Sequence, residues 1–445
     1  MTRVKKTFEK AFWLLLLISP ALDMINGIWT YLICGGTGGM LSSLDIKDIP
    51  GMSPSFLIRI AFLLMMVVYL FLQKKWKAIG MFCVIGLCWI GTIAGEYFRG
   101  VEFSLMADIQ YITRFCYCLV VVIAYSTMLK QSDRDPKTLR SFVDQVLCGS
   151  LGVLGLGVLV PYMLGMGFYT YADPLGYRGS RGFFYAGNDI TAVMMLMLPI
   201  ILVNWIEQRD IRHSWRPWLQ AVSAALGLLS MLIIGTKTSF LAVAVTLLIL
   251  GGYSVVIGFR KKEWTAALRL LIVLALVLAF LLLLLLLAES SPLATIWRSL
   301  TATAEYTEIA DVQTVVLSGR TLKLYQALSD FKDNLPWSAL VGIGRGSQTR
   351  IIEMDLVEVL LYYGLFGAVA MLWLYLSQGI RTVIDLFRAF TLRNLAVCVA
   401  LGLAVGYLFL AGHILFSVTA GFYFAFMIVY ARLFCSKDGI QTNIL

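Results

Sequence analysis

Two arginines lie close together in a glycine-rich stretch, directly before an apolar segment that starts at Asn188. Residues 177–182 read Tyr-Arg-Gly-Ser-Arg-Gly. Guanidinium groups bind the oxygens of a diphosphate through several donors at once, and the interleaved glycines let backbone N–H groups approach the same anion. We therefore assign Arg178 and Arg181 to diphosphate binding. The alternative is an interfacial arginine pair whose guanidinium groups reach lipid phosphates.

Three further cations stand at turns. Arg345 lies within Gly-Ile-Gly-Arg-Gly at residues 342–346, Arg320 follows Ser-Gly, and Lys237 lies in a tight turn between two apolar segments. We expect these three residues to add positive charge to the same kind of site. The glycine run is not a dinucleotide fingerprint, because it follows no strand and opens no βαβ unit. The alternatives are a plain turn with a solvated arginine, surface charge, and a lysine that snorkels to lipid headgroups.

Carboxylates follow Arg345 at the start of another apolar segment. Glu353 or Asp355, placed beside the arginines, is the candidate base that deprotonates an attacking hydroxyl. The alternative is that Asp355 caps a helix and Glu353 is merely exposed. The two histidines, His213 and His413, cannot form a metal site by themselves, and His413 is interpreted as a satisfied polar residue. We expect neither a metal nor a cofactor.

The elements that position these residues are membrane-spanning helices. Of the 445 residues, 60% are hydrophobic and only 14% are charged, against roughly 25% charged residues in soluble proteins. Apolar stretches of about 20 residues recur along the chain, which is the length that a helix needs to cross a bilayer. The sequence therefore predicts an all-α integral membrane protein with about 12 transmembrane helices.

The predicted spans have boundaries that are uncertain by several residues. They cover residues 11–32, 55–72, 78–98, 105–129, 141–164, 188–206, 217–234, 238–259, 266–288, 355–378, 394–411 and 415–434. Five charged residues fall within or at the edges of these spans, and we expect some of them to pair inside the bundle: Asp23, Arg59, Glu96, Asp108 and Arg114.

Basic residues alternate between the loops. They gather before the first predicted span and after the second, fourth, sixth, eighth, tenth and last. By the positive-inside rule these loops and both termini are cytoplasmic. The net charge of +10 is thereby explained without a nucleic-acid partner.

Two loops on the outward side are long. One covers residues 165–187 and contains the two arginines, and the other covers residues 289–354, between the ninth and tenth spans. In the second loop Ser318 precedes a helical pattern of Leu324, Leu328 and Phe331 that can lie on the membrane or on the bundle. No soluble domain is appended, so we expect a single polytopic membrane domain over residues 1–445.

In this order, the motifs resemble those of the O-antigen ligase and O-antigen polymerase (Wzy-type) superfamily of bacterial polysaccharide assembly. Each motif is short, so the ordered set carries the resemblance, which spans roughly residues 170–370. The matching pieces are residues 178–183 with Gly187-Asn188, Thr238-Ser239, Ser318-Gly319-Arg320, residues 340–344, and Glu353-Met354-Asp355 running into residues 363–367.

The resemblance implies a metal-independent, inverting glycosyltransferase of GT-C type in the bacterial cytoplasmic membrane. Its donor would be a polyprenyl-diphosphate-linked oligosaccharide, and a flippase and a chain-length regulator would be its partners. Arg178, Arg181 and Arg345 would bind the donor diphosphate and stabilise the charge that develops on it as it leaves. The acceptor hydroxyl would attack the anomeric carbon from the opposite face.

One departure from the ligase pattern favours a polymerase of repeat units. Many ligases carry a His-Asn or His-Ser element where this chain has Glu353-Met354-Asp355. Ligation of a finished glycan to a lipid or protein acceptor is the next hypothesis. A flippase or transporter of lipid-linked sugar would share the spans, but transporters usually hold functional charge near the bilayer midplane. A purely structural scaffold would tolerate alanine at Arg178, Arg181 and Arg345.

Overall fold

The computed structural model describes residues 2–36, 39–42, 54–171, 177–207, 215–287, 291–298, 320–348 and 351–435. Most of these residues are helical, and one short antiparallel hairpin pairs β1 (Tyr169–Tyr171) with β2 (Arg178–Ser180). The helices are α1 (Thr2–Ile33), α2 (Pro54–Leu72), α3 (Trp76–Phe98), α4 (Leu105–Lys130), α5 (Pro136–Met163), α6 (Gly187–Glu207), α7 (Arg216–Ile234), α8 (Lys237–Lys261), α9 (Thr265–Leu287), α12 (Arg320–Asp333), α13 (Trp337–Val341), α14 (Asp355–Arg388), α15 (Leu392–Leu410) and α16 (Val418–Phe434).

The prediction of a helical multi-pass membrane protein is confirmed. Among the described residues, 11 helices are long and apolar enough to cross a bilayer, and each coincides with one of the predicted spans. The remaining predicted span corresponds to α16, an apolar helix of 17 residues. The sides on which the termini and long loops lie stay predictions of the charge pattern.

By their internal contacts, the residues form two compact units. Unit 1 comprises Met1–Phe62, Ser132–Tyr306 and Arg388–Leu403, and unit 2 comprises Leu63–Gln131, Thr307–Phe387 and Ala404–Leu445. The expected single membrane domain stays a prediction, and each unit is described by itself below.

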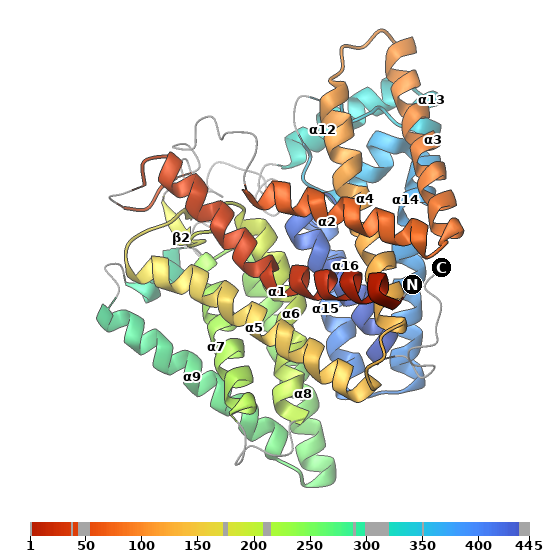
Figure 1. Cartoon of the computed structure of the whole chain (residues 1–445). Helices are drawn as coiled ribbons and strands as arrows, with labels where there is room; N and C mark the ends of the chain where they lie inside the picture. The colour runs from red at the N-terminus through yellow and green to blue at the C-terminus, as the bar shows by residue number, and fades with distance from the viewer. Residues whose placement is uncertain are drawn as a thin grey trace. The chain divides into compact units, whose positions relative to one another are not determined.

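The core of unit 1 is formed by α5, α6 and α7, which pack against one another (Figure 1). Almost every residue of α6 is buried, because α5, α7, α8 and α9 all contact it. Unit 1 also contains an ion cluster, in which the Arg393 guanidinium lies 2.8 Å from Glu207 and 3.4 Å from Asp144. The expectation that charges at the spans pair with one another holds for Asp23 and Arg59, which form an ion pair.

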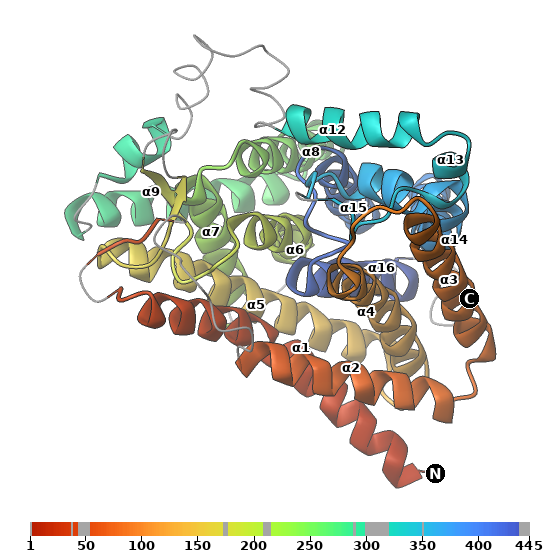
Figure 2. The same ribbon diagram turned by 90° about the horizontal axis from the view of Figure 1, so that it is seen from above.

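In unit 2, α4 packs along α16, and α12 leads into the short α13, which packs against α3 (Figure 2). The helical pattern predicted after Ser318 is confirmed as α12, on which Leu324, Leu328 and Phe331 are half-buried. Ser318 itself lies outside the described residues.

The helix α14 is broken one-third of the way along. Gly364 has φ 63° and ψ −168°, a conformation that interrupts the helical hydrogen bonds. The carbonyl oxygens of Leu361 and Tyr362 accept hydrogen bonds instead from the backbone N–H groups of Ile343 and Gly344. The first part of α14 is thus a short separate helix, and it carries Asp355 and Glu358.

Candidate functional site

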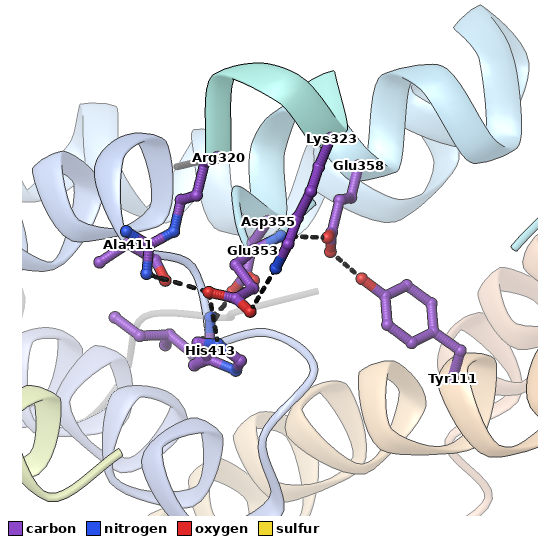
Figure 3. Close-up of polar contacts among 9 residues, drawn as sticks. Tyr111, Arg320, Lys323, Glu353, Asp355, Glu358, Ala411 and His413 are labelled. Atoms are coloured by element: carbon purple, nitrogen blue, oxygen red, sulfur yellow. Dashed lines mark hydrogen bonds and ion pairs between the residues drawn. The ribbon is translucent and has the colours of Figure 1, made fainter. Parts of the chain in front are cut away.

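Two cationic side chains and a histidine surround Glu353 in unit 2 (Figure 3). Lys323 Nζ lies 2.8 Å from Oε1, while Arg320 Nη2 lies 3.1 Å and His413 Nε2 lies 3.8 Å from Oε2. Arg320 and Lys323 share the first turn of α12, whereas His413 comes from the loop between α15 and α16. Three segments distant in the sequence therefore meet at one carboxylate.

These contacts set the ionisation of Glu353. Burial alone would raise its pKa, but the contacts with His413 and Lys323 outweigh burial and lower the pKa to about 2. Glu353 is consequently a carboxylate throughout the physiological range. A carboxylate with so low a pKa binds a proton weakly.

Glu353 and His413 both adopt left-handed backbone conformations, with φ values of 68° and 63°. They are two of the four non-glycine residues with positive φ in the described ranges. Such conformations cost about 1–2 kcal/mol for an L-residue and persist only where the surroundings enforce them, which occurs often at functional sites.

Asp355 enforces the turn at His413. Its Oδ1 accepts the backbone N–H of His413 at 2.8 Å, and its Oδ2 accepts those of Ile414 and Leu415 at 2.8 and 2.7 Å. Only 1% of Asp355 is exposed, so backbone N–H groups replace water as hydrogen-bond partners of its carboxylate. Asp355 is the first residue of α14, yet its carboxylate anchors the loop between α15 and α16.

Glu358 holds the backbone of Glu353 from the other side. One of its oxygens accepts the Glu353 N–H at 2.7 Å, and the other accepts the hydroxyl of Tyr111 from α4 (Figure 3). The Tyr111 ring stacks on Phe416 at a centroid distance of 3.8 Å, and the Arg345 guanidinium carbon lies 5.9 Å from the Tyr111 ring centroid. Arg345 is thus linked to the Glu353 cluster through one tyrosine.

Backbone N–H groups in and beside the glycine run around Arg345 donate hydrogen bonds to carboxylates of the protein itself. The backbone N–H groups of Arg345 and Gly346 donate to Asp108 at 3.2 and 3.0 Å, and that of Ser347 donates to Glu96 at 2.9 Å. A Cβ at Gly346 would collide with the Asp108 carboxyl group, as one at Gly344 would with Glu96. These N–H groups therefore have internal acceptors, and only the guanidinium of Arg345, which donates to Gln348 O at 2.6 Å, remains as a candidate anion ligand.

In unit 1 the Arg-Gly element forms β2 and the turn that follows it. Gly179 has φ 64°, and a side chain there would collide with the carbonyl oxygen of Ile234, the last residue of α7. This close approach brings β2 beside the turn that leads to the exposed Lys237 at the start of α8. The hydroxyls of Thr191 and Thr236 lie 3.4 Å apart and tie α6 to the same turn.

Arg181 carries a half-buried charge that the described residues leave uncompensated. Its guanidinium carbon lies 5.3 Å from the ring centroid of Phe168 and 5.9 Å from that of Tyr185, and its Nε is buried without a hydrogen-bond partner. No carboxylate in the described part of the chain forms an ion pair with it. Burial lowers the pKa of Arg181 to about 10, so the side chain stays protonated at neutral pH. Arg178, by contrast, donates to Arg298 O at 2.9 Å.

The structure groups the candidate residues of the sequence by unit. Arg178, Arg181 and Lys237 lie together in unit 1, and the others lie in unit 2: Arg320, Arg345, Glu353 and Asp355. Within the described residues, no three His, Cys, Asp or Glu side chains are arranged to hold a metal ion.

Sequence reasoning missed four members of the unit 2 cluster: Tyr111, Lys323, Glu358 and His413. Two of them carried a signal. Lys323 follows Arg320 by one helical turn, and Glu358 follows Asp355 in the same way, so each shares a helix face with a predicted residue. His413 is interpreted from the sequence as a satisfied polar residue, and its contact with the carboxylate of Glu353 is consistent with that interpretation.

Comparison with known proteins shows the family of this chain. The family model described as "O-antigen ligase like membrane protein" matches residues 5–306 and 301–434, which is nearly the whole chain. A search of curated proteins gave no match. The chain therefore belongs to the O-antigen-ligase-like membrane proteins, a family of glycosyltransferase-like ligases and polymerases that act on lipid-linked glycans.

Proposed function

We propose that this protein polymerises polyprenyl-diphosphate-linked oligosaccharide repeat units on the outer face of the bacterial cytoplasmic membrane. The acceptor hydroxyl displaces the diphosphate from the anomeric carbon with inversion, and no metal takes part. A flippase that delivers the donor and a regulator of chain length are the partners that this reaction implies.

The observation that carries the proposal is the uncompensated guanidinium of Arg181. A half-buried charge without a partner is unfavourable, and a bound anion would supply the opposite charge. The Arg181 side chain runs past Gly187, the first residue of α6. An anion bound there would also lie near the N-terminal end of α6, where the helix dipole favours negative charge. A diphosphate matches this combination in charge and in geometry.

The other cations take supporting roles in the proposal. Arg178 and Lys237, on the same side of unit 1, extend the positive field over the second phosphate of the donor. Arg345, with one hydrogen bond to a carbonyl, is a further candidate anion ligand within unit 2. Arg320 is paired with Glu353, so its charge acts mainly on the acidic segment 353–358, to which we assign the proton transfer.

The second candidate is a ligase that transfers a finished glycan to a lipid or protein acceptor, because the matched family is described by that activity. A third, a transporter of lipid-linked sugar, would use the same diphosphate site without breaking a glycosidic bond.

The test uses the purified protein in lipid with one polyprenyl-diphosphate oligosaccharide as the only substrate, and resolves the products by size. A ladder at repeat-unit intervals identifies a polymerase. Single transfer that requires a separate acceptor identifies a ligase, and movement across the bilayer without any new product identifies a transporter.

A matched pair of variants tests the diphosphate site in the same assay. Arg181→Met keeps the apolar stem of the side chain and removes its charge. Arg260→Ala removes an exposed arginine from the far end of α8 and is the control. We expect product formation to fall only in Arg181→Met; equal rates in both variants would contradict the assignment of Arg181.

A further inference from the structure

The two aromatic rings beside Arg181 differ in how far they are exposed. The Phe168 ring, 5.3 Å from the guanidinium carbon, is fully buried and belongs to the core of unit 1. The Tyr185 ring lies 5.9 Å from the same carbon and is 41% exposed. An exposed aromatic ring that touches a candidate phosphate ligand can contact the group to which the phosphate is bonded.

A hydroxyl group from β1 lies beside Arg181. A Cβ at Gly187 would lie 3.4 Å from Arg181 Cδ and 4.0 Å from Thr170 Cγ2, so both side chains pass the first residue of α6. Thr170 Oγ1 and Arg181 Nε are buried atoms, and neither has a hydrogen-bond partner among the described residues. Two neighbouring polar groups in this state are unfavourable, and a ligand with several acceptor oxygens would satisfy both.

The residues around Tyr185 in the sequence are polar. Arg181 contacts its ring, and the half-buried Asn188 and Asp189 follow Tyr185 by three and four positions. A polyprenyl chain would bring apolar groups against these side chains. A sugar ring, by contrast, offers an apolar C–H face to an aromatic ring and hydroxyl groups to polar neighbours. The surroundings of Tyr185 therefore favour a sugar over a lipid chain.

We propose that Tyr185 determines specificity for the first sugar of the donor, the one bonded to the diphosphate, and that Thr170 donates a hydrogen bond to that diphosphate. This rests on the function proposed above, through the diphosphate site at Arg181. The ring of Tyr185 contacts the C–H face of the sugar while the guanidinium binds the phosphate oxygens. Because polyprenyl diphosphate carries no sugar after transfer, the site binds the donor more tightly than this product. All three side chains belong to unit 1.

The first experiment measures the affinity of the lipid-reconstituted protein for two ligands, polyprenyl diphosphate and the same lipid bearing the oligosaccharide. Tyr185→Leu removes the aromatic ring, and Tyr185→Phe keeps it. We expect Tyr185→Leu to lower the affinity for the glycosylated lipid by about 10-fold and to leave the affinity for the other lipid unchanged. Tyr185→Phe should bind both ligands as the wild type does.

Tyr177→Leu is the matched control. Tyr177 is 52% exposed and lies in the same outward loop, but its ring packs against Tyr169 at a centroid distance of 5.4 Å. Tyr169 and Thr170 are consecutive in β1, so their side chains point to opposite faces of the hairpin. Tyr177→Leu should therefore leave both affinities unchanged. Equal losses in Tyr177→Leu and Tyr185→Leu would mean that both tyrosines only anchor the protein at the membrane interface.

Thr170→Val tests the hydroxyl group, because valine has nearly the same shape as threonine. We expect it to lower the affinity for both ligands to the same extent, by about 10-fold, since both contain the diphosphate. Unchanged affinities in Thr170→Val would contradict the hydrogen bond assigned to Thr170.

The outcomes separate the sugar site from the function on which it rests. If Tyr185→Leu weakens both ligands equally, or neither, the assignment of Tyr185 to the sugar is wrong. Loss of both affinities in Arg181→Met would still support the diphosphate site in that case. If the wild type binds the glycosylated lipid more tightly but forms no glycosidic bond, the proposed transfer has failed, whereas a selective loss in Tyr185→Leu would still support the sugar site.

Discussion

At the scale of single residues, the charge of Arg181, which no described carboxylate compensates, lowers the stability of the free protein. The same charge is expected to favour binding of an anionic donor. The described residues offer its half-buried guanidinium two aromatic rings and no carboxylate. Replacing such a charge, which lacks a partner, by an apolar side chain of similar shape should stabilise the free protein. When an anionic donor is bound, arginine should be more favourable at this position than an apolar side chain, because only the arginine can pair with the anion.

Arg181→Met is therefore expected to stabilise the donor-free protein by about 1–3 kcal/mol while lowering kcat/KM for the lipid-linked donor by about 10²- to 10³-fold. Thermal unfolding in detergent measures the first effect, and the transfer assay measures the second. Loss of stability together with activity would mean that the guanidinium has a structural role instead.

The carboxylate of Glu353 makes the stability of unit 2 dependent on pH. Its folded pKa of about 2 lies below the ordinary value of 4.5, so the folded state binds fewer protons than the unfolded state. The resulting stabilisation is fully present above about pH 4.5 and is lost as the pH falls toward 2. A shift of this size corresponds to about 3 kcal/mol, since one pKa unit is about 1.4 kcal/mol.

Glu353→Gln should consequently flatten the fall in unfolding temperature between about pH 5 and pH 3. The difference between wild type and variant should be largest at neutral pH and shrink on acidification. Parallel curves over that range would show that the ion cluster at Glu353 does not contribute to stability.

At the scale of elements, the break in α14 determines where the acidic residues lie. A continuous helix would satisfy the carbonyls of Leu361 and Tyr362 internally, and the segment around residues 343 and 344 would lose its hydrogen-bond partners. The break depends on Gly364, whose φ and ψ fall in a region that only glycine occupies readily. A Cβ at Gly364 would also lie 2.5 Å from the carbonyl carbon of Leu340.

Gly364→Ala is expected to destabilise the protein by at least about 3 kcal/mol and to abolish transfer, because backbone strain and the clash add. Gly379→Ala is the matched control on the same helix, where a Cβ meets open space. That change should be neutral or stabilise by up to about 1 kcal/mol. Similar unfolding temperatures for the two variants would contradict the account of the break.

At the scale of the whole molecule, the sequence predicts the helices well and the site only in part. Each predicted span coincides with a helix, because about 20 apolar residues is a local signal that the bilayer requires. The pairing of β1 with β2 and the break at Gly364 carry no periodic pattern of their own. The break is accompanied by backbone hydrogen bonds from Ile343 and Gly344, which precede α14.

The difference between local signals and contacts between distant segments also explains which site residues could be found from the sequence. Arginines among glycines are unusual in composition, so Arg178, Arg181 and Arg345 stood out without any knowledge of their surroundings. The role of the glycines around Arg345 did not, since it depends on Glu96 and Asp108 from other helices. The contact of His413 with Glu353 likewise depends on the fold, which brings together two segments distant in the sequence.

The central claim is that the protein breaks a bond between sugar and diphosphate for every glycosidic bond it makes. The measurement is the amount of free polyprenyl diphosphate released by the lipid-reconstituted wild type, set against the number and anomeric configuration of the new linkages. We predict one release per linkage, with each linkage inverted relative to the donor. Transport of the donor with neither release nor linkage, or linkages that retain the donor configuration, would contradict the account.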